Sequence, residues 1–277
     1  MSSAKEALTN ALGESAWDES WDILSRLDPE IFEASVKLKA VPRQKKHLSR
    51  KMQCLVRLAV DSAATHLYLP GIRLHIKDAA AAGATLAEVM EVLELTSTLG
   101  IHACNIGVPL LVQVMKEEGV YESHPTAGKP FDSQRLALKQ DFEKKRGYWH
   151  SFWDGRVTRL KFVGHLLNQL IADFLALDPE FFGAYTEFSS VPWSKKVTGV
   201  DGHGGALAPR DKELIYCAFD LAATHLYVSG GKEHMRNALR YGASPEQILE
   251  VLELATPLSL HTLHATAPLV QEVYRVV

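Results

Sequence analysis

Residues 61–68 read Asp-Ser-Ala-Ala-Thr-His-Leu-Tyr, and residues 220–227 read Asp-Leu-Ala-Ala-Thr-His-Leu-Tyr. The likeness continues outward from these stretches. When 61–111 is aligned with 220–270 without a gap, 21 of 51 positions are identical. Average composition would give roughly three identities over that length. The chain therefore contains an internal duplication with an offset of 159 residues.

Upstream of these stretches the offset is shorter. Leu-Asp-Pro-Glu at 27–30 returns at 177–180, which is an offset of 150. The difference predicts a nine-residue insertion in the second copy at 197–205, where glycines and polar residues indicate a surface loop. Residues 119–133 carry glycine and proline and predict a linker. Two domains are expected, 1–124 and 133–277.

Composition excludes several classes of protein. With 277 residues, 47% hydrophobic and 23% charged, the chain is typical of a globular protein. The net charge of −3 with dispersed lysines and arginines argues against a nucleic-acid partner. No apolar run approaches 18 uncharged residues, so no membrane partner is expected. Three cysteines without Cys-x-x-Cys spacing favour free thiols and a cytoplasmic location.

The hydrophobic periodicity predicts an all-α fold of two tandem helical-bundle domains related by a pseudo-twofold axis. Gly83 and Gly242 are expected just after helix ends, and capping boxes at 85–88 and 244–247 are expected to start the next helices. A helix break is predicted near Pro70-Gly71. The recurring Glu91, Glu94, Glu250 and Glu253 are interpreted as a polar helix edge or as positions of salt bridges between the subunits of an oligomer.

Histidines give the strongest chemical signal, because three of them recur at equivalent positions. The candidate catalytic residues are His66, His225, His75, His234, His102 and His261. A break near residue 70 would let His66 and His75 face one pocket, with His102 nearby. The alternative is a structural role, in which a buried histidine forms the same hydrogen bond in both copies. Other recurring polar positions are candidate substrate-binding residues: Asp61, Asp220, Tyr68, Tyr227, and the cations Arg73 and Lys232.

The run from His75 to Ala79, followed by Gly83-Ala84-Thr85, Glu88 and Glu91, resembles the carboxymuconolactone decarboxylase and alkyl hydroperoxidase D superfamily. About 55 residues of each copy share the resemblance. It implies an all-α bundle that forms homo-oligomers. The hydroperoxidase branch uses Cys-x-x-Cys-x-x-x-His, but tyrosine and glycine stand at the cysteine positions here: Tyr68, Gly71, Tyr227 and Gly230. Thiol chemistry of that branch is therefore not expected.

The remaining branch implies a decarboxylase that uses no cofactor and acts on a small carboxylated lactone. Loss of CO₂ would leave an enolate, which a tyrosine or histidine could stabilise and a histidine could protonate. Arg73 or Lys232 could bind the carboxylate. Alternatives are an isomerase or hydratase of a small enone, a ligand-binding protein without catalysis, and a helical scaffold.

A metal site is not expected from spacing. Zinc ligands commonly include a close pair in the sequence. His66 and His75 lack such spacing, and His261 with His264 has it in one copy only, since Asn105 occupies the matching position.

Overall fold

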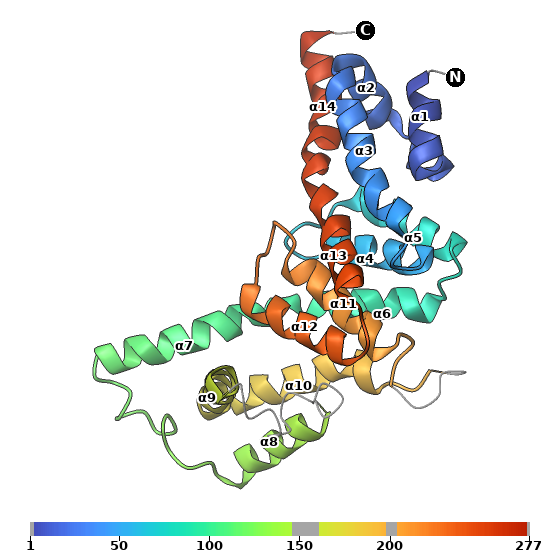
Figure 1. The fold of residues 1–277 in the computed structure, drawn as a ribbon. Coiled ribbons are helices and arrows are strands. Elements are labelled where there is room, and N and C mark those ends of the chain that lie inside the picture. Colours follow the sequence, from blue (N-terminus) through green and yellow to red (C-terminus); the bar gives the residue numbers. More distant parts are fainter. Residues whose placement is uncertain (1–2, 146–160, 198–203, 276–277) are drawn as a thin grey trace. The chain divides into compact units, whose positions relative to one another are not determined.

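The computed structural model describes residues 3–145, 161–197 and 204–275. These residues contain helices and no strand, which confirms the all-α prediction. The α-helices are α1 (Ser3–Leu12), α2 (Glu19–Leu27), α3 (Pro29–Lys45), α4 (Arg50–Ser62), α5 (Leu69–Ala81), α6 (Leu86–Ser97), α7 (His102–Glu117), α8 (Ser133–Lys145), α9 (Lys161–Leu177), α10 (Pro179–Ser194), α11 (Pro209–Asp220), α12 (Val228–Arg240), α13 (Pro245–Ala255) and α14 (His261–Tyr274) (Figure 1).

The chain forms two compact units that differ from the two repeats. The first unit combines residues 1–97 with 207–277, and the second consists of residues 98–206. Parts of both repeats thus lie in the first unit, which holds the central helices of each. The repeat boundaries at 1–124 and 133–277 remain a sequence prediction.

Helix ends follow the local sequence signals. Gly83 and Gly242 have φ of 84° and 88°, a conformation in which glycine avoids the strain of a Cβ atom. The Ser244 hydroxyl and the Gln247 amide form the predicted capping box of α13. Thr85 and Glu88 exchange the equivalent bonds, because Thr85 N donates to Glu88 Oε2 and Glu88 N donates to Thr85 Oγ1. Both predicted caps are confirmed.

The predicted break between helices lies a few residues earlier than expected. Helix α4 ends at Ser62, a turn occupies 63–68, and Pro70 stands in the first turn of α5. Proline suits this position because the first-turn N–H groups have no partner within the helix. Leu67 closes the turn with a left-handed φ of 47°, and the equivalent Leu226 has φ of 51°.

Helices α4 and α11 form the centre of the first unit and are buried along almost their whole length. They pack against each other, α13 packs on α4, and α6 packs on α11. Because α11 and α13 are the second-repeat equivalents of α4 and α6, each contact has a counterpart with the repeats exchanged. Thr65 Oγ1 lies 3.5 Å from its own equivalent, Thr224 Oγ1. This pattern is the local pseudo-twofold arrangement.

Two glutamates bond to the opposite repeat. The interpretation of these positions as a polar helix edge was wrong for both. Glu91 and Glu250 are fully buried. Glu91 Oε1 lies 3.1 Å from Lys212 Nζ and accepts a hydrogen bond from Leu207 N. Glu250 makes the equivalent contacts to the first repeat.

Glu250 accepts from Gln53 Nε2 at 2.8 Å and from Leu48 N at 3.3 Å. Gln53 and Leu48 are the counterparts of Lys212 and Leu207 at the offset of 159. Each carboxylate is therefore neutralised or solvated by the opposite repeat, as a buried acid requires. Glu253 is paired with Lys45 at the edge of the same interface.

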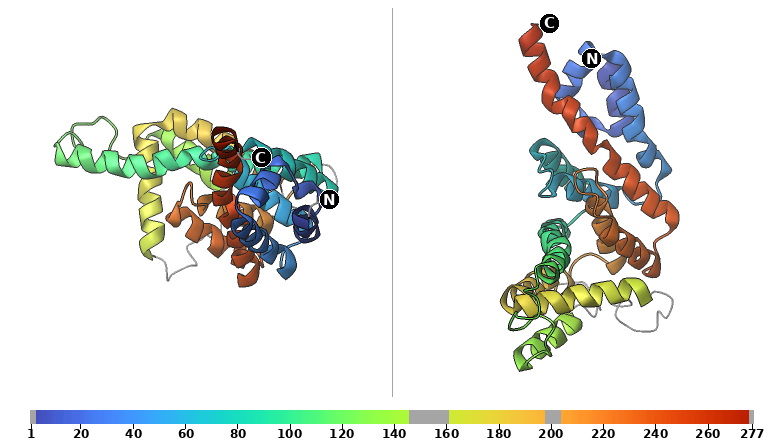
Figure 2. Two further views of the ribbon diagram at one scale, coloured as in Figure 1. Left: turned by 90° about the horizontal axis from the view of Figure 1, so that it is seen from above. Right: turned by 90° about the vertical axis from the view of Figure 1, so that its left-hand side faces the viewer.

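A helical layer of the first unit combines the N-terminal helices with α14. Helix α14 packs on α2, and both views in Figure 2 show the red C-terminal helix beside the blue N-terminal helices. Leu8, Trp21 and Phe32 form the core of this layer. Consequently the last helix of the second repeat lies next to elements that precede the first repeat's central helix.

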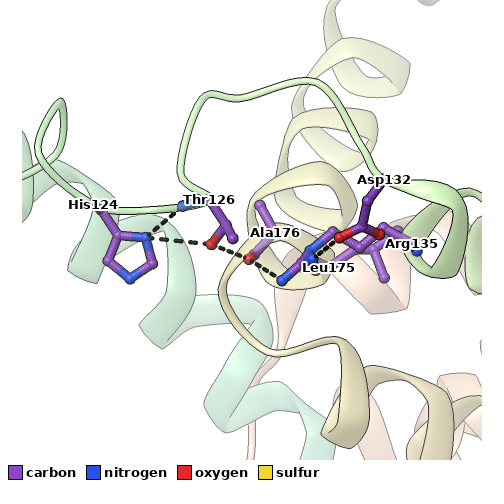
Figure 3. Close-up of polar contacts among 6 residues, drawn as sticks. All are labelled: His124, Thr126, Asp132, Arg135, Leu175 and Ala176. Carbon is purple, nitrogen blue, oxygen red and sulfur yellow. Dashed lines mark hydrogen bonds and ion pairs between the residues drawn. The ribbon is translucent and has the colours of Figure 1, made fainter.

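The predicted linker is attached within the second unit. Thr126 Oγ1 donates to Ala176 O at 2.6 Å, and Arg135 donates to Leu175 O and Ala176 O (Figure 3). These carbonyls lie at the C-terminal end of α9, where helical acceptors lack partners. Thr126 thus anchors the predicted linker to α9, and Arg135 does the same for the first turn of α8. Of the predicted insertion loop, residues 198–203 lie outside the described part.

One segment, Leu86–Glu117, is long and apolar enough to cross a membrane by length and composition. A single such segment is weak support for a membrane span, and this one contains Glu91, which pairs with Lys212 inside the protein. The expectation that no membrane is a partner remains a prediction.

The bonds that Glu91 and Glu250 make to the opposite repeat predict the effect of substitutions on stability. Glu91→Leu leaves the Lys212 charge buried without its carboxylate, so unfolding should need about 3–5 kcal/mol less free energy. Lys212→Gln copies the Gln53–Glu250 pairing of the other half and should cost less than Lys212→Leu. Denaturant unfolding of the three variants measures this. A loss below about 1 kcal/mol for Glu91→Leu would contradict the assignment.

Candidate functional site

The first candidate site is a group of polar side chains around Asp61, at the C-terminal end of α4. We call Asp61, His66, Tyr68, His75 and His261 the Asp61 cluster. Asp61 is only 3% exposed. Its Oδ2 lies 3.4 Å from His75 Nε2, and its Oδ1 lies 3.8 Å from His261 Nδ1. One buried carboxylate thus faces a histidine from each repeat.

His66 meets the histidine of the opposite repeat. Its Nε2 lies 2.8 Å from His261 Nδ1, a hydrogen-bond distance. The Tyr68 ring stacks on His261 with ring centres 3.9 Å apart. His66 and His261 are 195 residues apart in the chain. The two come together because α14 packs beside the N-terminal helices.

The turn after α4 positions His66 and Tyr68. Tyr68 N donates to Asp61 O at 2.9 Å, and His66 N donates to Ala63 O. Left-handed backbone at Leu67 folds the chain back. Such a φ is uncommon for a leucine, so the surrounding contacts must offset its strain.

Gly71 gives the Asp61 carboxylate its space. A Cβ at Gly71 would lie 2.0 Å from Asp61 Oδ2 and 2.8 Å from Tyr68 Cδ1, which is a steric overlap. A Cβ at Gly230 would lie 2.5 Å from Asp220 Oδ2 in the same way. Gly71 and Gly230 stand at the second cysteine position of the hydroperoxidase pattern. A carboxylate therefore fills the room that a thiol side chain would need.

Burial shifts the proton affinities of this cluster in opposite directions for acids and bases. It raises the pKa of Asp61 to about 7, although Lys39 and Arg57 pull the other way. Burial, with Arg57 and Lys39 nearby, lowers the pKa of His75 well below its usual range. The pKa of His261 falls to about 3, again chiefly through burial. The histidines are therefore neutral near pH 7, and the aspartic acid is half protonated.

The α2 and α3 side of the site adds a second set of polar groups. His264 Nδ1 lies 2.8 Å from Ser20 Oγ, which donates to Asp18 Oδ1. Lys39 Nζ lies over the Trp21 ring, 5.4 Å from its centre. Burial and the nearby Arg57 lower the pKa of Lys39 to about 8. Lys39 therefore remains mostly cationic at neutral pH.

The second candidate site surrounds the equivalent aspartate in α11. We call Glu213, Tyr216, Asp220 and His234 the Asp220 cluster. His234 Nδ1 lies 2.6 Å from Glu213 Oε2, and His234 Nε2 lies 3.7 Å from Asp220 Oδ2. Tyr216 stacks on the His234 ring at 4.2 Å. The imidazole thus stands between two buried carboxyl groups.

Electrostatics differ between the two clusters. Burial raises the pKa of Asp220 to about 7, with Glu213 adding to the rise and His234 opposing it. The first-repeat equivalents of Glu213 and Tyr216 are Cys54 and Arg57. The Asp61 cluster therefore has a cation where the Asp220 cluster has a tyrosine, and a neutral thiol where it has an acid.

The other predicted residues take varied positions. His225 and Tyr227 are half-buried in the turn after α11, with ring centres 6.1 Å apart. His102 begins α7 in the second unit and is half-buried. Arg73 and Lys232 are exposed.

Several residues in or beside the two clusters do not recur between the copies. Glu213, Lys39 and Ser20 have residues of a different type at the matching positions of the other copy, so recurrence gives no signal for them. The close pair of His261 and His264 was a usable signal for His264, because the two lie on one face of α14.

Gly71 supplies a test of the packing around Asp61. Gly71→Ala should lower the free energy of unfolding by about 1–3 kcal/mol, since the new methyl group displaces the carboxylate. Asp61→Ala in the same chain should relieve most of that loss, so the double variant is less destabilised than the sum of the two singles. Gly107→Ala is the matched helical control, because open space surrounds its Cβ position. Additive effects of Gly71→Ala and Asp61→Ala would contradict the assigned contact.

Comparisons with known proteins agree with this architecture. Residues 192–268 match the model of the carboxymuconolactone decarboxylase family. A solved structure from Burkholderia xenovorans LB400, provisionally described as a gamma-carboxymuconolactone decarboxylase subunit, is 41% identical to this chain. The match covers 98% of this chain and 96% of that one, with a TM-score of 0.81. No curated protein matches the chain. By its identity and coverage with that structure, the chain belongs to the carboxymuconolactone decarboxylase family.

Proposed function

We propose that this protein is a decarboxylase of a small carboxylated lactone or a related unsaturated carboxylate, in which an aspartate–histidine pair handles the proton. The family and the solved relative support decarboxylase-like chemistry in general. The proposed role in proton transfer rests on a buried aspartate that faces a buried histidine. This pair occurs as Asp61 with His75 and again as Asp220 with His234.

The reaction needs little from the protein. The bond between the lactone carbon and the carboxylate breaks, CO₂ leaves, and the electron pair passes through the unsaturated system to the lactone carbonyl oxygen. A proton must then return to carbon. The protein must therefore stabilise an enolate oxygen and supply one proton.

The Asp61–His75 pair suits the proton transfer. Burial disfavours a second charge in the pair, so the two groups hold one transferable proton near neutral pH. A proton donor with a pKa near the working pH is the most efficient. His75 and His234 are thus the proposed general acids, each coupled to its aspartate, with His66, His225, His102 and His261 as further candidates.

Tyr68 is the proposed partner of the enolate oxygen. Burial and the nearby acids Asp18 and Asp61 raise the pKa of Tyr68 to about 12, so its phenol keeps its proton. A protonated phenol can donate to an oxyanion. Tyr227 holds the equivalent position in the second repeat.

Turnover tests the paired histidines. CO₂ release from a panel of small carboxylated unsaturated lactones identifies a substrate. The double variant His75→Asn/His234→Asn should then lose about 10²- to 10⁴-fold in rate while remaining folded. Each single variant reports the share of its own repeat. Activity of the unaltered protein should fall as pH rises through about 7, because the pairs then release the proton they donate.

His47→Asn is the matched control, since this histidine is exposed and lies outside both clusters. Its turnover should equal that of the unaltered protein. Unchanged activity per folded molecule in the double variant would defeat the proposal. Binding of the lactones without CO₂ release would do the same and favour a ligand-binding protein.

The substrate carboxylate generates a separate prediction. Lys39 is a partly buried cation beside the Asp61 cluster, whereas Arg73 is exposed. Lys39→Met should raise KM for the carboxylated substrate about tenfold or more and change the affinity for the uncharged product little, because a charge-assisted bond is lost. Arg73→Met, measured in parallel, should leave KM unchanged. The reverse pattern would assign the carboxylate to Arg73.

A further inference from the structure

We propose that Asp61, His66 and His261 form a binding site for a divalent transition-metal ion. The inference goes beyond the decarboxylase proposal, which uses protein groups alone. Each of the three residues offers one ligand atom, and these three atoms lie within 4.8 Å of one another. The two nitrogens are 2.8 Å apart, and the oxygen is 3.8 Å from His261 Nδ1.

These separations suit a shared ion. Metal–ligand bonds of about 2.0–2.2 Å place neighbouring ligand atoms about 3–3.5 Å apart. The nitrogen pair and the oxygen–nitrogen pair each need to move by less than about 1 Å to reach that range. All three atoms are donors of the kind that zinc and its first-row neighbours bind.

Neighbouring groups hold two of the three ligands in place. His75 contacts Oδ2 of Asp61, which leaves Oδ1 to face the histidines. Tyr68 stacks on the His261 ring and fixes its plane. Contacts of this kind orient the ligands of metal sites in proteins.

The sequence retains the three ligand types as a set. At the offset of 159, Asp61, His66 and His261 correspond to Asp220, His225 and His102. Neighbouring positions have diverged, since His264 corresponds to Asn105 and Arg57 to Tyr216. Each copy thus keeps one acid and two histidines at the matching positions of the sequence.

The surrounding charges shape what the site would bind. Lys39 and Arg57 are near enough to lower the pKa of His75, and they oppose a dication. The buried Asp61 carboxylate opposes them. Three protein ligands leave further positions open on an ion of four to six ligands, and the two cations favour an anion at those positions.

Cobalt(II) alone is the probe. The full-length protein, treated with chelator and dialysed, is titrated with Co²⁺ by calorimetry and by visible absorption, and the titration is repeated with Zn²⁺. Saturable binding of both ions is expected, together with ligand-field bands of a low-symmetry Co²⁺ site. Binding should also raise the melting temperature.

Variants locate the site. His66→Gln and His261→Gln should each reduce the number of Co²⁺ ions bound per chain by one. His264→Gln is the matched control, because His264 lies on the same helix but bonds to Ser20. Melting temperatures without metal show that the variants are folded. Absence of saturable binding, or the same stoichiometry in His66→Gln and His261→Gln as in the unaltered protein, would overturn the proposal.

The test is independent of the proposed reaction. Metal binding is measured without substrate, so its failure leaves the turnover experiment on His75 and His234 unaffected. Likewise, a negative result in the turnover experiment would leave the result of the metal titration unaffected.

Discussion

Two buried glutamates determine how the repeats of this protein combine. A carboxylate without access to water is costly unless donors surround it, and Glu91 and Glu250 each find their donors in the opposite repeat. This requirement fixes α6 against α11 and α13 against α4. Helix α14 continues from α13, so the same register carries His261 to the end of α4. The Asp61 cluster depends on that exchange.

Within this frame, one small residue decides the chemistry near α5. Gly71 leaves a space that the Asp61 carboxylate occupies, and Gly230 does the same for Asp220. The chain therefore keeps the histidine of the hydroperoxidase pattern but pairs it with an acid in place of a thiol. Burial raises the proton affinity of the acid and lowers that of the imidazole, so the acid holds the proton of the pair near neutral pH and His75 is neutral.

The two clusters show how far duplicated sites can diverge on one scaffold. Backbone geometry is nearly the same, down to the left-handed leucines at 67 and 226. The charges differ, because Arg57 and Lys39 face the first cluster while Glu213 bonds to His234 in the second. A scaffold fixed by helix packing tolerates such exchanges, since they alter the local field and leave the helices in place.

The sequence by itself determined the duplication, the all-α class, the helix caps, and the residues that recur. These depend on spacing and local hydrogen bonds, which a linear pattern records. Only the tertiary structure decided that His66 meets His261, that Glu91 and Glu250 are buried, and that Glu213 and Lys39 join the clusters. Those outcomes arise from packing between segments more than a hundred residues apart, and local sequence patterns carry no signal for such contacts.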